Sequence, residues 1–182
     1  VARVHFSEER QTPSFIGLKR SQQVYAKEQA KTALDNYLAV RFGVDNLVPA
    51  REVKLSDNYS VIELHQYFKG IKVEHARFTA LSKDGKIQFF NGAWYNVPLS
   101  LVTNPGLTKS AALSKAKASA KARKFAWEQL DDLIALEKNP GTKAALQKER
   151  DEYLPQGELV IMQDHSKTGV VQMRLAYKYN IY

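Results

Sequence analysis

The chain has 182 residues, of which 44% are hydrophobic and 25% are charged, and its 27 basic against 19 acidic side chains give a formal net charge of +8. This length suits one large globular domain or two small ones, and no apolar run is long enough to span a membrane. Cysteine is absent, which excludes disulfides, cysteine-based zinc sites and thiol catalysis, while the basic excess fits either an acidic partner or solubility alone.

The N-terminal region predicts an arm followed by a helix. Residues 1–20 contain Pro13 and Gly17 without a clear period, so we expect an extended N-terminal arm. Ser21 is a candidate N-cap for a helix that runs to about residue 42, and Gly43 fits the stop signal just past its end. The apolar residues recur at three- and four-residue spacing: Ala26, Ala30, Ala33, Leu34, Tyr37, Leu38 and Phe42.

Residues 59–92 predict a meander of three strands. The two tight turns are Lys69-Gly70 and Asp84-Gly85, where glycine supplies the positive φ that such turns need. Residues 44–56 are expected to cross over to this meander, with a short strand at 51–55.

In the second strand of the meander, the apolar residues change from odd-numbered to even-numbered positions. In a regular strand, Ile71 and Val73 would lie on one face and Phe78 and Ala80 on the other. One extra residue in a strand flips its register, so we predict a β-bulge near His75-Ala76. A regular ladder through residues 72–80 would refute this.

The second half begins after the linker 98–107, which contains Pro105-Gly106. Thr108 is the expected N-cap of a helix over about 109–124. Its expected inner stripe is Leu113, Ala116, Ala120 and Trp127.

Two shorter helices are expected within 127–153, separated at Asn139-Pro140-Gly141. A strand at 157–163, a turn at 167–169 and a final alternating strand complete the chain. The residues that share one face of that last strand are Val171, Met173, Leu175, Tyr177, Tyr179 and Ile181. The predicted fold class is therefore α+β, with two consecutive subdomains, each a long helix packed on an antiparallel β-sheet.

No motif nominates a catalytic, metal-binding or cofactor-binding residue. The histidines are His5, His65, His75 and His165, and none lies in the His-Glu-x-x-His pair of zinc peptidases. A two-residue turn at Lys69-Gly70 pairs His65 with Glu74, which predicts an exposed cross-strand contact. The acidic clusters at 131–132 and 149–152 are best interpreted as solvated faces.

The helix at 109–124 is rich in lysine. Lys117, Lys121 and Lys124 fall on one face, and such a helix could follow a nucleic-acid backbone or an anionic surface. It lacks interleaved aromatic residues for base stacking, which argues against nucleic acid as a partner and favours an alanine-rich packing helix.

The meander resembles the fungalysin/thermolysin propeptide (FTP) domain. Its pattern Q-x-x-x-G-x-x-V … G-x-V-x-x-x-N-G is matched, with isoleucine at the middle valine, by Gln66, Gly70, Val73, Gly85, Ile87, Asn91 and Gly92. The resemblance covers about 21–97. Residues 108–182, with a helical insertion at about 127–153, resemble a PepSY domain through the helix start at 107–112, the strand GELVI at 157–161 and RLAYKY at 174–179.

The resemblance implies a prodomain that inhibits a secreted bacterial zinc metallopeptidase and assists its folding, acting in cis or, after cleavage, in trans. It implies that Gly70, Gly85, Asn91 and Gly92 specify turns of the fold. Candidate partner contacts are His65, Tyr67, Tyr179 and Tyr182. Two alternatives stay open: a free-standing PepSY-type binding module acting in trans on a peptidase or envelope protein, and a binder of nucleic acid or anionic surfaces through the basic helix.

The chain departs from the family patterns in two regions. Lys72 and His75 stand where the FTP pattern commonly has proline and glycine. The chain also ends at Tyr182, before a further strand that a PepSY domain normally has. We therefore expect an open edge on the last sheet and a chain that is a piece of a longer precursor.

Overall fold

The computed structural model describes residues 3–19, 21, 25–164 and 172–182. The chain divides into two compact units, of which unit 1 comprises Val1–Thr103 and Val160–Ala176 and unit 2 comprises Asn104–Leu159 and Tyr177–Tyr182. Helices and a mixed sheet are both present, which agrees with the predicted α+β class. His165 and Val171, and the turn predicted at 167–169, lie outside the described residues.

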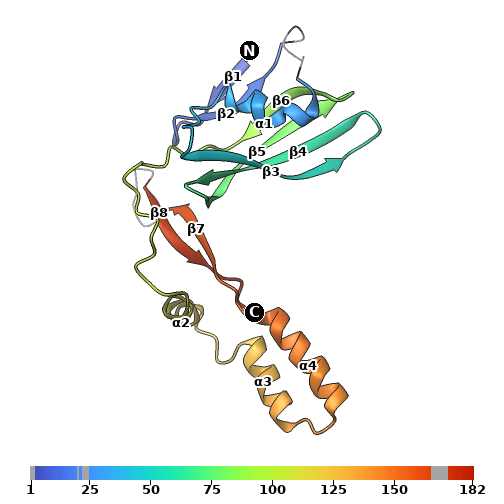
Figure 1. Cartoon of the computed structure of the whole chain (residues 1–182), viewed down its shortest axis with the longest axis vertical. Helices are drawn as coiled ribbons and strands as arrows, with labels where there is room; N and C mark the ends of the chain where they lie inside the picture. Colours follow the sequence, from blue (N-terminus) through green and yellow to red (C-terminus); the bar gives the residue numbers. More distant parts are fainter. Residues whose placement is uncertain (1–2, 20, 22–24, 165–171) are drawn as a thin grey trace. The chain divides into compact units, whose positions relative to one another are not determined.

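Unit 1 is built on a sheet whose main path has the strand order β1-β2-β6-β5-β4-β3 (Figure 1). Its strands are β1 (Arg3–Phe6), β2 (Pro13–Gly17), β3 (Asp45–Lys54), β4 (Tyr59–Phe68), β5 (Ile71–Lys83) and β6 (Lys86–Gly92). The predicted meander is confirmed as β4, β5 and β6. Both turns have positive φ, at Lys69 and Gly70 (47° and 80°) and at Asp84 and Gly85 (49° and 74°).

The prediction of an N-terminal arm was wrong. Residues 3–17 form the antiparallel pair β1 and β2, and β2 continues the sheet by pairing with β6. Ile16 is completely buried in the core, so the segment is anchored by an apolar side chain that a short, irregular stretch did not reveal. Similarly, β3 is ten residues long, whereas only a short strand was expected there.

The first helix is much shorter than predicted. A 3-10 turn, η2 (Lys27–Gln29), leads into α1 (Ala30–Asp35). The helix cannot begin at Ser21 because Tyr25 and Lys27 form backbone hydrogen bonds with Ile87 and Gly85, which hold the chain extended against β6. The predicted apolar stripe is buried only in part, at Ala30, Ala33, Leu34 and Leu38, while Phe42 is fully exposed.

The predicted bulge in β5 is confirmed, and it is larger than one residue. His65 of β4 pairs with Arg77, but Tyr67 pairs with Lys72. Gln66 alone therefore lies opposite the four residues 73–76. His75 within this bulge has a φ of 60°, in the left-handed region that favours glycine.

The bulge divides the interior of unit 1 into two apolar clusters. After the bulge, Phe78 and Ala80 pack with α1, Trp94 and the inner face of β4. Before and within it, Val73 and Ala76 pack in a second cluster, whose other buried members are Phe68, Tyr95, Val97, Ile161 and Met173. Trp94 and Tyr95 are both buried.

Two further strands join the sheet. β7 (Glu158–Gln163) pairs in parallel with β5 at Lys72 and Val73, and β8 (Met173–Lys178) pairs with β7. The strand at 157–163 was predicted, but its pairing with β5 of the meander was not. An independent second sheet with a long helix packed on it is therefore not confirmed.

Unit 2 contains three helices: α2 (Lys109–Ala120), α3 (Ala126–Leu136) and α4 (Pro140–Tyr153). Thr108 caps α2 by accepting a hydrogen bond from the Ala111 N–H, as predicted. Asn139 caps α4, with Pro140 in the first turn. α2 ends earlier than expected because Lys121 adopts a left-handed conformation, and none of its residues is buried. Among the described residues, no helix is long and apolar enough to cross a membrane.

Candidate functional site

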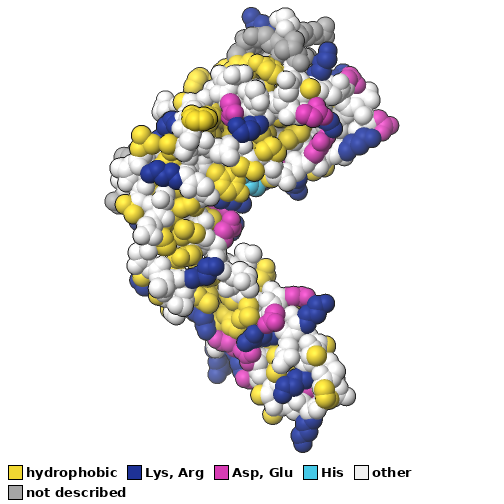
Figure 2. All heavy atoms as spheres, in the orientation of Figure 1, with side chains coloured by type: hydrophobic (Ala, Val, Ile, Leu, Met, Phe, Trp, Pro, Cys, Tyr) yellow, Lys and Arg dark blue, Asp and Glu magenta, His cyan; other side chains and the backbone are white. Residues whose placement is uncertain are grey.

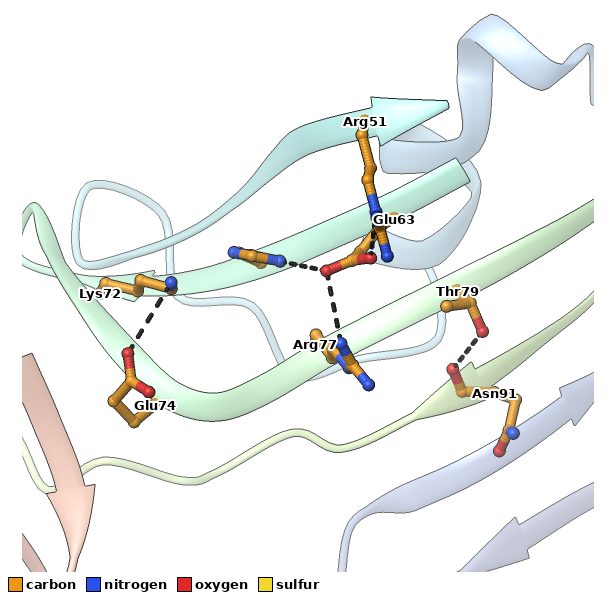
Figure 3. Close-up of polar contacts among 8 residues, drawn as sticks. Arg51, Glu63, Lys72, Glu74, Arg77, Thr79 and Asn91 are labelled. Atoms are coloured by element: carbon orange, nitrogen blue, oxygen red, sulfur yellow. Dashed lines mark hydrogen bonds and ion pairs between the residues drawn. The ribbon is translucent and has the colours of Figure 1, made fainter. Parts of the chain in front are cut away.

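A cluster of charged side chains lies on the face of the sheet opposite α1, across β3, β4 and β5 (Figure 3). Glu63 of β4 is at its centre. The Arg51 Nε donates a hydrogen bond to Glu63 at 2.9 Å, and the Arg77 Nη1 forms an ion pair with it at 3.6 Å. The carboxylate therefore joins three strands, because its two arginine partners come from the neighbours on either side.

Glu63 also pairs with His65, whose Nε2 lies 2.6 Å from Oε1, the carboxylate oxygen that Arg77 also contacts, whereas Arg51 binds Oε2. This contact and the Arg51 hydrogen bond lower the pKa of Glu63 from 4.5 to about 2. Glu63 is 8% exposed, so a nearly buried carboxylate is kept ionised by the cations around it.

The predicted contact between His65 and Glu74 was wrong. The bulge in β5 moves Glu74 out of register with His65, which instead lies opposite Arg77. Glu74 forms an ion pair with Lys72 at 3.7 Å. His65 instead contacts the carboxylate of Glu63, two residues earlier on the same strand.

The bulge forms a groove of about 370 Å³ next to this cluster. Its walls come from residues 72–77 of β5 and from Glu63 and His65 of β4. The lining is mostly charged and imidazole side chains, with Val73 and Ala76 below. The groove suits a polar ligand group, because Lys72 and Arg77 line it together with Glu63 and Glu74.

The cluster is built from contacts of cationic side chains with one carboxylate. Across the described parts of the chain, no three histidine, aspartate or glutamate side chains are grouped so that they could hold a metal ion. Glu63 accepts a hydrogen bond from Arg51, forms an ion pair with Arg77 and contacts the His65 ring, and these contacts lower its basicity. The arrangement is suited to binding charge.

The other predicted site residues lie elsewhere. Gly70 and Gly85 occupy the two turns, but Asn91 and Gly92 belong to β6 and not to a turn. Glycine is required at position 92 because the backbone of β5 lies too close for a side chain. An added Cβ would overlap the Arg77 carbonyl oxygen and lie 2.6 Å from the Phe78 Cα. Tyr67 is half-buried in β4, opposite Lys72.

The two C-terminal tyrosines belong to unit 2, whereas His65 and Tyr67 belong to unit 1. The Tyr179 hydroxyl donates a hydrogen bond to the Lys109 carbonyl oxygen at 2.5 Å, and burial raises its pKa. Tyr182 is 61% exposed, with its ring 5.7 Å from that of Tyr153.

The lysines of the basic helix are partly engaged within unit 2. Lys117 pairs with Glu128 and lies 5.2 Å from the centre of the Phe125 ring, and Lys124 pairs with Asp132. On the face drawn in Figure 2, Lys and Arg side chains are interspersed with Asp and Glu and form no continuous basic stripe. These pairings weaken the case for a nucleic-acid backbone as partner.

Sequence reasoning missed the cluster around Glu63. Arg51 begins the short strand expected at 51–55, but the sequence does not give the register of that strand against β4, which pairs Arg51 with Glu63. The available signal was the alternation of Glu63, His65 and Tyr67 along β4, which places them on the face away from the apolar core. Recognising β3 as a full strand would have brought Arg51 beside Glu63.

Comparison with known protein families identifies part of unit 1. Residues 45–93 match the model of the Fungalysin/Thermolysin Propeptide Motif. The matched segment runs from the start of β3 to the residue after β6, and it includes the bulge and the charged cluster.

This match supports a propeptide of a thermolysin-like peptidase. The motif is a propeptide motif and not a catalytic domain, and a propeptide implies association with its peptidase domain. Thermolysin-like propeptides belong to secreted enzymes. No curated protein matches the chain.

Proposed function

We propose that the chain is a prodomain that inhibits a secreted zinc metallopeptidase of the thermolysin type and assists its folding. The match of residues 45–93 to the propeptide motif carries this proposal. The matched strands form the structural centre of unit 1, because β4 and β5 supply much of both apolar clusters. The proposal extends to residues 108–182 as a PepSY-like second part.

The physical basis of folding assistance is linkage. A segment that binds the native peptidase but not its unfolded chain lowers the free energy of the native state by mass action. When the segment is covalently attached, its effective concentration is high, so even modest affinity is sufficient.

The physical basis of inhibition is steric exclusion from the substrate cleft. Unit 1 has strand edges that can take part in such a complex, since β3 ends the main path of the sheet and its residues 50–54 are exposed. Pro49 and the irregular register after it limit pairing along the first half of this edge. The second half of β3 is therefore the better candidate for β-strand addition.

The test uses the isolated chain and a panel of purified thermolysin-like zinc peptidases. We expect micromolar chain to inhibit hydrolysis of a short synthetic peptide by at least one of them. We also expect it to raise the yield of active enzyme on refolding from denaturant. Gel analysis at each time point establishes that the chain is intact. A folded, intact chain that does neither against the whole panel would overturn the proposal.

A further inference from the structure

We propose that the groove at the β5 bulge is a docking surface for a carboxylate-bearing segment of the peptidase domain. Arg51 and Arg77 would hold the carboxylate, and His75 would contact the same segment at the edge of the groove. This inference rests on the proposed function and deepens it by assigning the contact residues and the chemistry that they recognise.

The two arginines have binding capacity that the fold does not use. Arg51 is 66% exposed and donates one hydrogen bond to Glu63, and Arg77 is 63% exposed and contacts Glu63 only at 3.6 Å. Neither guanidinium has another ionic or hydrogen-bonding partner among the described residues. A guanidinium presents five N–H donors in a planar fork that matches a carboxylate, so most of these donors are available to a partner.

Glu63 gives the arginines a fixed position. Its carboxylate is nearly buried and lies between them, as Figure 3 shows, so it orients Arg51 through a hydrogen bond and attracts the Arg77 guanidinium toward the same point. Preorganisation of this kind lowers the entropic cost of binding. Glu63 thus has a positioning role toward the arginines.

His75 is held in an unfavourable backbone conformation without an evident structural reward. The other described non-glycine residues with positive φ lie in turns or at a helix end: Gln11, Lys69, Asp84 and Lys121. His75 alone lies within a strand. Its side chain is exposed and forms no hydrogen bond or ion pair with the described residues.

Glycine would fit this backbone better. A histidine ring here is therefore better explained by contact with a partner than by packing. Its position among the residues that line the groove places that contact beside the arginines.

The charge of the surface selects an acidic partner. The groove and the adjoining Arg51 contain three permanent cations and two carboxylates, a net charge of +1. The chain as a whole has a net charge of +8. Such complementarity speeds association and excludes basic partners.

The first experiment measures inhibition of a thermolysin-like peptidase that the wild-type chain inhibits. We expect the inhibition constant to rise about tenfold for Arg51→Gln/Arg77→Gln and less for Arg51→Lys/Arg77→Lys, which keeps the charge but loses the planar fork. His75→Ala should raise it a few-fold. Circular dichroism and urea unfolding establish that each variant is folded.

The matched control is Lys138→Gln/Lys148→Gln, which removes two exposed cations from unit 2. It should leave the inhibition constant unchanged. An equal loss in this control, or no loss in the arginine variants, would overturn the docking surface and leave only general charge attraction.

The second experiment separates the groove from the proposed function. The capped tetrapeptide Ala-Asp-Glu-Ala is titrated into isotope-labelled chain, with Ala-Asn-Gln-Ala as the neutral control. We expect saturable amide shifts at residues 72–77 for the acidic peptide alone, lost in Arg51→Gln/Arg77→Gln. Absence of such shifts overturns the docking surface, even for a chain that inhibits. A chain that binds the peptide but inhibits nothing overturns the prodomain and leaves an acidic-peptide groove.

Discussion

The side-chain amide of Gln66 forms two hydrogen bonds with the backbone of Tyr95: Nε2 donates to the carbonyl oxygen at 2.7 Å, and Oε1 accepts from the N–H at 3.0 Å. Gln66 is completely buried and is the single residue opposite the bulge. Where β5 leaves the ladder, the glutamine thus satisfies backbone groups of the segment that follows β6.

Replacing Gln66 with methionine should be strongly destabilising. The side-chain volume is kept, but the Tyr95 N–H and carbonyl lose their partner in a buried setting, at a cost of about 2–4 kcal/mol in the free energy of unfolding. Urea unfolding followed by tryptophan fluorescence measures this. Gln88→Met is the control, because that amide bonds at the surface, and a similar loss there would contradict the explanation.

The stability of unit 1 should depend on pH through Glu63. Its folded pKa of about 2 lies below the ordinary 4.5, so its contribution is fully present above pH 4.5 and is lost as the pH falls toward 2. Because Arg51 and Arg77 are well exposed, solvent screening limits this contribution to about 1–2 kcal/mol.

The measurement is urea unfolding from pH 6 to pH 2.5 for wild type and Glu63→Gln. The variant should be less stable at pH 6 and should lose less stability on acidification. Parallel pH profiles for the two proteins would show that Glu63 does not carry the dependence.

Gly92 should not tolerate alanine. The added methyl group would collide with the backbone of Arg77 and Phe78 at the end of β6, where its pairing with β5 stops, and we expect a loss of about 2–3 kcal/mol in the free energy of unfolding. Gly106→Ala is the matched control, since an added Cβ there meets no atom within 4 Å. Thermal unfolding of both variants decides whether close approach is the reason for glycine.

At position 75, glycine should be more stable than alanine. Both variants lose the imidazole ring, but only glycine relieves the left-handed strain, so His75→Gly should exceed His75→Ala by about 1 kcal/mol in unfolding free energy. Urea unfolding of the two variants at one pH measures the difference. Equal stabilities would mean that the bulge relaxes to another conformation when histidine is removed.

The sequence was most informative where local chemistry dictates structure. Signals that act within a few residues predicted the two turns at Lys69-Gly70 and Asp84-Gly85 and the helix start at Thr108. The break between α3 and α4 was also predicted from Asn139-Pro140. The change from odd-numbered to even-numbered apolar positions between Val73 and Phe78 likewise predicted the bulge. These signals require no knowledge of distant parts of the chain.

The features that were missed depend on contacts between distant segments. α1 is short because Tyr25 and Lys27 bond with residues 60 or so positions away, and propensity cannot reveal that competition. The parallel pairing of β7 with β5 joins Lys72 to Val160. The cluster around Glu63 depends on both the β3 register and the size of the bulge, so its members could not be grouped from spacing alone.

The bulge also makes β5 a structural member of both apolar clusters of unit 1. Val73 and Ala76 belong to one cluster, and Phe78 and Ala80 belong to the other, on a single continuous strand. Neither cluster can lose its part of β5 without straining the part held by the other. The two clusters are thus tied into one cooperative unit, and a chain fragment ending between them would lack a complete version of either.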